Sequence, residues 1–188
     1  MAAAGSDNLV FVRDSRGFTL IELLVVILIL GILLTIGMAN YRHARIRGAE
    51  VATIGALSAI NQAQFAFMQT CGRQKFAPKL SSLGKVNPNS GTAYLSPDLT
   101  GGEEVDKSGY RISMGGTEVS DVVQTCTGET PLEGYSVTAD PIVVGTTGIR
   151  HFGTNLDLTI YESPESLKGK IPERGSPEIG QEVKGLTR

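Results

Sequence analysis

Residues 18–38 read FTLIELLVVILILGILLTIGM, and this stretch decides how the rest of the chain is interpreted. At a rise of about 1.5 Å per residue, a helix of this length covers about 30 Å, the thickness of a bilayer's hydrocarbon core. The apolar run of a secretory signal peptide is shorter, about 7 to 15 residues. The sequence therefore predicts a membrane-spanning helix, with signal-type cleavage at the small-x-small site 37–39 as the lesser alternative.

One acidic residue, Glu22, interrupts this apolar stretch close to its start. A charged carboxylate at the centre of a membrane helix costs about 2.5 to 3.5 kcal/mol on insertion scales, so such a group is usually paired or functional. The alternative is an interfacial glutamate that lipid headgroups solvate. We expect Glu22 to be functional.

The residues around Glu22 form a specific motif. A polar leader, residues 1–17, ends in Arg-Gly, and residues 16–22 read RGFTLIE. This resembles the cleavage motif of type IV pilins and of the pseudopilins of type II secretion systems. The resemblance implies that a prepilin peptidase cuts after Gly17 and methylates the new N-terminal residue, Phe18, and that Glu22 is the assembly glutamate of the family. The positions between them are filled by Thr19, Leu20 and Ile21.

Cleavage would also resolve the cost of burying Glu22. The amine freed at Phe18 is cationic, so the Glu22 carboxylate of one subunit can pair with the Phe18 amine of its neighbour. Desolvation offsets much of that attraction, so the pair would specify axial register more than it adds stability. The resemblance implies a homopolymer built through N-terminal helices, with an inner-membrane platform protein and a cytoplasmic assembly ATPase as partners.

The charges that flank the apolar segment do not decide its orientation. Arg13 and Arg16 precede it, whereas Arg42, Arg45 and Arg47 follow it, and the positive-inside rule favours opposite orientations at the two ends. The resemblance implies a single-pass protein of the bacterial inner membrane. Its N-terminus would be cytoplasmic and its head periplasmic, and the subunit would be extracted into a periplasmic or surface filament.

One departure from the family concerns the end of the apolar segment. Many members carry a proline there, and the corresponding residue here is Ala39. Without proline a fixed kink loses its usual cause. Gly31 and Gly37 each weaken a helix by about 1 kcal/mol relative to alanine, which leaves local unwinding between Gly31 and Ala39 open.

Residues 40–71 predict the amphipathic continuation of the same helix. Proline is absent from this range, and small or apolar side chains recur at helical spacing. These side chains belong to Ala49, Ala52, Ala56, Ile60, Ala63 and Phe67. Cys71-Gly72 predicts the end of the helix, because Gly72 can adopt the left-handed conformation that closes helices.

Residues 72–161 predict a head domain with a loop region followed by an antiparallel sheet. Residues 73–109 are rich in Pro, Gly, Ser and Asn, which predicts little regular structure. Alternating runs then predict three or four strands. The runs are Tyr110–Met114, Val119–Thr125, Tyr135–Ala139, Ile149–Phe152 and Leu156–Tyr161. A helix followed by hairpins indicates an α+β, pilin-like roll, and residues 162–188 are expected to be a flexible tail that buries little.

The two cysteines, Cys71 and Cys126, belong to no CxxC pair and to no cluster with histidine. In an exported head they could form one disulfide, which would stabilise the fold by roughly 3 to 4 kcal/mol. Two buried free thiols are the alternative.

The remaining composition gives no support to an enzyme or to a nucleic-acid binder. The chain has 17 basic and 19 acidic residues, and no long basic block. His43 and His151 lack sequence-near ligand partners, so we expect structural or solvent-facing roles and no metal. The GxSxG and GxxxxGK[ST] patterns are absent.

An acidic loop is the one candidate for cation binding. Major pseudopilins that this sequence resembles often bind calcium in their heads, but the spacing of these acids matches no EF-hand. A solvated acidic loop is the preferred interpretation, so no cofactor is expected. The acids are Asp98, Glu103, Glu104 and Asp106.

Two functional hypotheses follow. The first is a structural subunit of a type IV pilus or a type II secretion pseudopilus. The modest head without a C-terminal cysteine pair favours a pseudopilin similar to the major subunit. The alternative is a single-pass, membrane-anchored periplasmic ligand-binding domain that does not polymerise.

Overall fold

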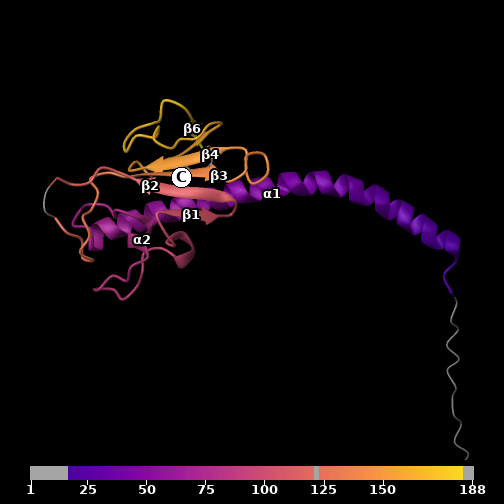
Figure 1. Ribbon diagram of the computed structural model, residues 1–188, viewed down its shortest axis with the longest axis horizontal. Helices are drawn as coiled ribbons and strands as arrows, with labels where there is room; N and C mark the ends of the chain where they lie inside the picture. The colour runs from indigo at the N-terminus through magenta and orange to yellow at the C-terminus, as the bar shows by residue number, and fades with distance from the viewer. Residues whose placement is uncertain (1–16, 121–122, 184–188) are drawn as a thin grey trace, which may run out of the picture. The chain divides into compact units, whose positions relative to one another are not determined.

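The computed structural model describes residues 17–120 and 123–183, with the side chains of residues 36–39 left aside. A long N-terminal helix is followed by a six-stranded antiparallel sheet (Figure 1), which confirms the predicted α+β, pilin-like fold. The elements are α1 (Leu20–Thr70), α2 (Leu80–Leu83), the 3-10 helix η1 (Pro97–Leu99), β1 (Glu104–Lys107), β2 (Tyr110–Gly115), β3 (Ser136–Pro141), β4 (His151–Asn155), β5 (Ile160–Ser163) and β6 (Gln181–Glu182).

The chain divides into two compact units, Met1–Asn40 and Tyr41–Arg188. The first contains the apolar part of α1, and the second contains the rest of α1 and all six strands. Helix α1 is continuous through Gly31 and Ala39, so the unwinding that the sequence left open is not seen in this structure. The predicted leader lies almost wholly outside the described residues, as do Arg13 and Arg16.

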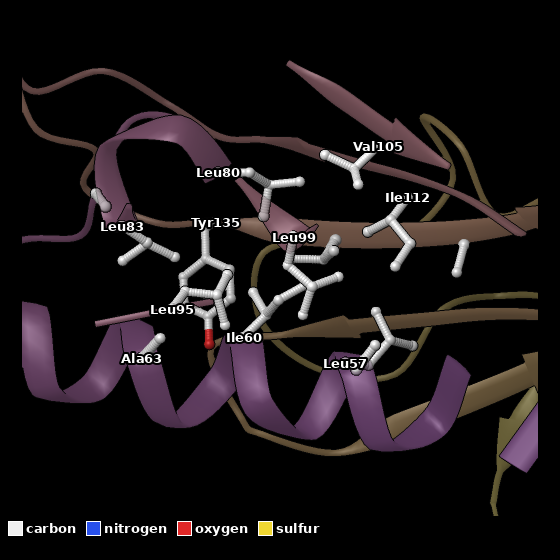
Figure 2. Packing of buried hydrophobic residues seen from close by; sticks show 14 of the residues in the cluster. Leu57, Ile60, Ala63, Leu80, Leu83, Leu95, Leu99, Val105, Ile112 and Tyr135 are labelled. Atoms are coloured by element: carbon white, nitrogen blue, oxygen red, sulfur yellow. The ribbon is translucent and has the colours of Figure 1, made fainter. Parts of the chain in front are cut away.

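Within the second unit, α1 buries one face against the sheet. Leu57, Ile60, Ala63 and Phe67 are buried at a spacing of three to four residues, which places them on one side of the helix. Figure 2 shows the first three of them. Ala56 joins them, but the predicted face extended too far toward the N-terminus. Of its other members, Ala49 is half-buried and Ala52 is exposed.

The core lies between this face of α1, the sheet and the segment around α2 and η1. Leu80, Leu83, Leu95 and Leu99 approach from that segment, and Ile112 approaches from β2 (Figure 2). The region predicted to be a loop therefore contributes buried leucines to the core. It keeps little regular structure because only α2, η1 and β1 form there.

The end of α1 differs from the prediction in its backbone conformation. Gly72 is not left-handed; the positive φ angles fall on Arg73 (51°) and Gln74 (68°). Gly72 is needed for a close approach instead, since a Cβ there would lie 2.0 Å from the carbonyl oxygen of Lys75. The helix ends with the N–H of Gly72 donating to the carbonyl of Phe67 at 2.8 Å.

The sheet is a meander in which each strand pairs with its neighbours in the order β1 to β6. The predicted runs at 110–114 and 135–139 correspond to β2 and β3, whereas β4 and β5 begin two and four residues later than predicted. β1 was missed because Glu104–Lys107 buries only Val105, which is too little alternation to recognise.

The predicted strand Val119–Thr125 is wrong for its described residues. Val119 and Thr125 pair instead with the loop that follows, through hydrogen bonds to the carbonyls of Pro131 and Glu129. Cys126 is bonded to Cys71, so this segment is tied to the end of α1 and not to a sheet edge. Residues 121 and 122 lie outside the described part.

The expectation that residues after 161 bury little is also wrong. Leu167 and Ile171 are buried against Tyr161, and β6 pairs with β5. These two side chains can pack closely on the sheet because Gly153 of β4 has no side chain. A Cβ at Gly153 would lie 2.9 Å from Ile171 and 3.2 Å from Leu167. Residues 184–188 lie outside the described part.

Candidate functional site

The N-terminal motif begins with three residues that precede the helix. Gly17, Phe18 and Thr19 lie before α1, and all three are exposed. Oγ1 of Thr19 accepts a hydrogen bond from the N–H of Glu22 (3.3 Å), and its carbonyl accepts one from the N–H of Leu23 (3.2 Å). Thr19 therefore occupies the N-cap, with Glu22 at the third helical position, the pattern of a capping box.

This cap fixes where α1 begins. The Gly17–Phe18 peptide bond precedes Leu20, the first residue of α1, and lies outside the helical hydrogen-bond ladder. Sequence reasoning placed Thr19 in the motif but missed its role as the cap. The Thr-x-x-Glu spacing was the pattern that could have revealed it.

The apolar part of α1 is uncovered. Every side chain described between Phe18 and Thr35 is exposed, and among the described residues α1 is long and apolar enough to cross a membrane. An apolar surface of this extent requires lipid or other protein chains to cover it. Glu22 lies within it, and within residues 17–120 and 123–183 no basic side chain forms an ion pair with its carboxylate.

A disulfide fastens the other end of α1 to the head. Cys71 directly follows the helix and is bonded to Cys126, with 4.9 Å between their Cα atoms. The N–H of Cys126 also donates to the carbonyl of Cys71 at 3.0 Å. The bridge closes a separation of 55 residues, which corresponds to about 4 kcal/mol in the chain-entropy model.

A buried carboxylate joins α1 to the loop before β4. Glu50 is 4% exposed, and Oε1 accepts hydrogen bonds from the N–H groups of Ile149 (3.1 Å) and Arg150 (3.3 Å). Oε2 accepts from Nε (3.0 Å) and Nη2 (2.6 Å) of Arg150, and Arg150 also pairs with Glu162 on β5. Burial alone raises the pKa of Glu50, but these hydrogen bonds outweigh it and hold the pKa below the ordinary value of 4.5.

Two buried amides connect the middle of α1 to the head. Asn61 donates to Oγ1 of Thr154 (2.8 Å) and accepts from the hydroxyl of Tyr135 (3.0 Å). Burial raises the pKa of Tyr135, so its hydroxyl stays a donor. Gln64 accepts from the N–H of Ala77 (2.8 Å) and donates to the carbonyl of the same residue (3.2 Å). These contacts hold the helix in one register against the sheet.

The candidate calcium ligands are distributed among basic partners. Asp98 pairs with Lys107, Glu103 with Lys79 (2.5 Å), Glu104 with Lys168 (2.7 Å) and Asp106 with Arg111 (2.8 Å). Within the described ranges, no three carboxylate, histidine or cysteine side chains gather as a metal site would require. The acids therefore belong to a surface of ion pairs.

The two histidines lie apart from the motif. Nδ1 of His151 is 2.6 Å from Oδ1 of Asp140. The other carboxylate oxygen of Asp140, Oδ2, accepts a hydrogen bond from the hydroxyl of Ser166. His43 is exposed on α1. The cluster around His151 connects β3, β4 and the C-terminal segment, which is a structural arrangement.

Comparison with protein families gives a match at the N-terminus. Residues 12–38 match the family described as the prokaryotic N-terminal methylation motif. No curated protein and no solved structure matches the chain at a significant level. The match covers the residues in which the cap, the exposed apolar helix and Glu22 occur together. The chain therefore carries, at its N-terminus, the prepilin motif of the type IV pilins and pseudopilins.

Proposed function

We propose that this chain is a structural subunit of a type IV pilus or a type II secretion pseudopilus. A prepilin peptidase removes residues 1–17 by cutting after Gly17, methylates Phe18, and leaves a subunit that polymerises through the N-terminal part of α1. The observation that carries the proposal is the methylation motif at residues 12–38, which overlaps an apolar helix whose described side chains between Phe18 and Thr35 are all exposed.

In this proposal, cleavage creates a charged partner for Glu22. Before cleavage the nitrogen of Phe18 is an amide and carries no charge. After cleavage it is an ammonium one residue ahead of the Thr19 cap. A carboxylate moved from water into an apolar helix bundle needs such a counter-charge. The Glu22 carboxylate of one subunit pairs with the Phe18 amine of the next, so processing and assembly are linked.

The head contributes rigidity to the filament subunit. Helix α1 is attached to the head at four points along its second half. These are the ion pair of Glu50, the hydrogen bonds of Asn61 and Gln64, and the disulfide at Cys71, which directly follows the helix. A pull on the helix therefore moves the head with it. This suits a subunit that a platform protein and an assembly ATPase extract from the inner membrane.

Mass analysis of the full chain tests the processing step. The chain is co-expressed with a prepilin peptidase, extracted from membranes and measured intact. We expect the mass of a chain that begins at Phe18 and carries one methyl group. Gly17→Ala should retain the leader, whereas the matched variant Gly31→Ala, which has open space around its added Cβ, should be cleaved like the wild type.

Two results would contradict the proposal. A mature chain that begins at Met1 in the presence of the peptidase would exclude processing at Gly17. A correctly processed chain that stays monomeric in the presence of the assembly proteins would favour the alternative, a membrane-anchored ligand-binding domain.

A further inference from the structure

The loop between β3 and β4 exposes apolar side chains in an ordered conformation. Residues 142–149, called here the apolar loop, lie beside α1 (Figure 1). The exposed fractions are 52% for Val143, 64% for Val144 and 54% for Ile149. Oγ1 of Thr147 donates to the carbonyl of Val143 and accepts from its N–H, at 3.2 and 3.1 Å. The valines are therefore held outward by a closed turn.

A groove of about 410 Å³ lies between the apolar loop and α1. Its polar lining includes Arg45 on α1, Ser108 in the β1–β2 turn and Thr146 in the apolar loop. All three are exposed, and among the described residues none of their side chains has a hydrogen bond or ion pair with the protein. One guanidinium and two hydroxyls are thus available to a ligand, and together they match an anionic oxygen group such as a phosphate.

The charge along α1 next to the groove is positive. Arg42 and Arg47 are exposed on the same stretch of α1 as Arg45. The nearest acid along the helix, Glu50, is buried and already satisfied by Arg150. A phosphate next to this surface meets several cations and no free carboxylate of that helix.

The sequence keeps this surface close to lipid. Arg45 follows the apolar segment, which ends at Met38, by only seven residues. Seven residues reach at most about 25 Å when fully extended and about 10 Å when helical. A subunit anchored through residues 18–38 therefore holds the groove at a high local concentration next to lipid headgroups.

We propose that the groove and the apolar loop bind the surface of an anionic phospholipid bilayer. Arg45 pairs with a headgroup phosphate, the hydroxyls of Ser108 and Thr146 donate to it, and Val143 and Val144 insert at the boundary between headgroups and acyl chains. The inference rests on the membrane anchoring in the proposed function. The contact gives the head a resting position that extraction of the subunit must break.

The test uses the full chain in lipid nanodiscs made of phosphatidylcholine alone or of equal parts phosphatidylcholine and phosphatidylglycerol. A Val144→Cys variant is labelled with an environment-sensitive fluorophore, since the native cysteines are bonded to each other. We expect the label to be shielded from a neutral aqueous quencher in the anionic discs and accessible in the neutral ones. A label on Ser90→Cys, exposed elsewhere on the head, should be accessible in both.

Charge variants identify the contact. Arg45→Gln should lower the ratio of shielded to quencher-accessible label by about five-fold, which corresponds to the contribution of one basic residue at an anionic surface. Raising the salt concentration should act in the same direction. Arg174→Gln, an exposed arginine outside the groove, should leave the shielding unchanged.

Several results would overturn the inference. Equal accessibility at position 144 in both discs would exclude lipid binding. Shielding that depends on the number of chains per disc would assign the loop to contacts between copies. Loss of shielding on addition of soluble glycerol phosphate, without dependence on lipid charge, would assign the groove to a free phosphate. A chain that does not co-elute with discs contradicts the anchoring itself, whereas an anchored chain with an exposed loop contradicts only this inference.

Discussion

Arg150 donates two side-chain hydrogen bonds, of 3.0 and 2.6 Å, to Oε2 of Glu50, which lies 100 residues earlier in the chain. The pair joins α1 to the loop before β4, and Arg150 also stacks 5.3 Å from the ring centroid of Phe152. Because Glu50 is buried, its charge is tolerated only while these donors are present. The stability of the head therefore depends on this contact.

Glu50→Ala should lower the free energy of unfolding of the full chain in detergent by about 2 to 3 kcal/mol, measured by urea titration. The substitution leaves the N–H groups of Ile149 and Arg150 without their acceptor. The expected loss is below that of a fully buried pair because the Arg150 side chain is 42% exposed and water can solvate it. Glu165→Ala, which removes an exposed pair with Lys170, is the control and should change stability by less than about 0.5 kcal/mol.

Glu50 should also make stability depend on pH in the acid range. Its folded-state pKa is below the ordinary value of 4.5, so the ionised form stabilises the fold. That contribution is fully present above the unfolded-state pKa and is lost as the pH falls through the folded-state pKa. Glu50→Gln should therefore flatten the profile of unfolding free energy below about pH 4.5. Parallel profiles for the two proteins would contradict this role.

Removal of the disulfide should destabilise the head strongly. The double variant Cys71→Ala/Cys126→Ala is expected to lose about 3 to 4 kcal/mol of unfolding free energy, since its unfolded chain regains the freedom of the closed loop. A reducing agent should lower the stability of the wild type by a similar amount and leave that of the double variant unchanged. A wild type insensitive to reduction would show that the loop is constrained without the bridge.

Glu22→Ala should separate processing from assembly. We expect the variant to enter the membrane and to be cleaved at Gly17, but its incorporation into filaments, counted by sedimentation and electron microscopy, should fall at least about ten-fold. Glu118→Ala, an exposed glutamate of the head, should assemble like the wild type. Normal assembly of Glu22→Ala would remove the carboxylate–amine pair from the mechanism.

Gly153→Ala should loosen the C-terminal segment. The added Cβ would lie 2.9 Å from Ile171 and 3.3 Å from the carbonyl of Val137, so the buried side chains must shift. We expect a loss of about 1 to 3 kcal/mol and faster proteolysis after Ser163. Gly115→Ala, which adds a Cβ into open space on β2, is the matched control and should not change the cleavage rate.

The N-terminal segment of the molecule was predictable because the interactions that form it are local. The length and apolarity of residues 18–38, the carboxylate at Glu22 and the motif around Gly17 are consecutive in the chain, and the helix they form satisfies its own backbone. The α+β order was predictable for the same reason. The helix pattern precedes the strand patterns, and β2 and β3 alternate clearly enough to be recognised.

The errors occurred where long-range contacts outweigh local pattern. Val119 and Thr125 pair with the following loop beside the Cys71–Cys126 bridge, although their segment alternates like a strand. Leu167 and Ile171 are buried in a segment rich in proline, glycine and charge, because Gly153 opens the face of the sheet beneath them. The local sequence of either segment does not predict these long-range contacts.

The amino-acid order of this protein is thus sufficient for its membrane-type helix and its processing motif, because hydrophobic length and a cap depend on neighbours in the chain. The head is different. Three of its features depend on contacts between residues far apart in the chain. They are the ion pair of Glu50, the position of the apolar loop beside Arg45 and the packing of the C-terminal segment on the sheet. Burial and hydrogen-bond satisfaction depend on these contacts, and they are properties of the folded chain as a whole.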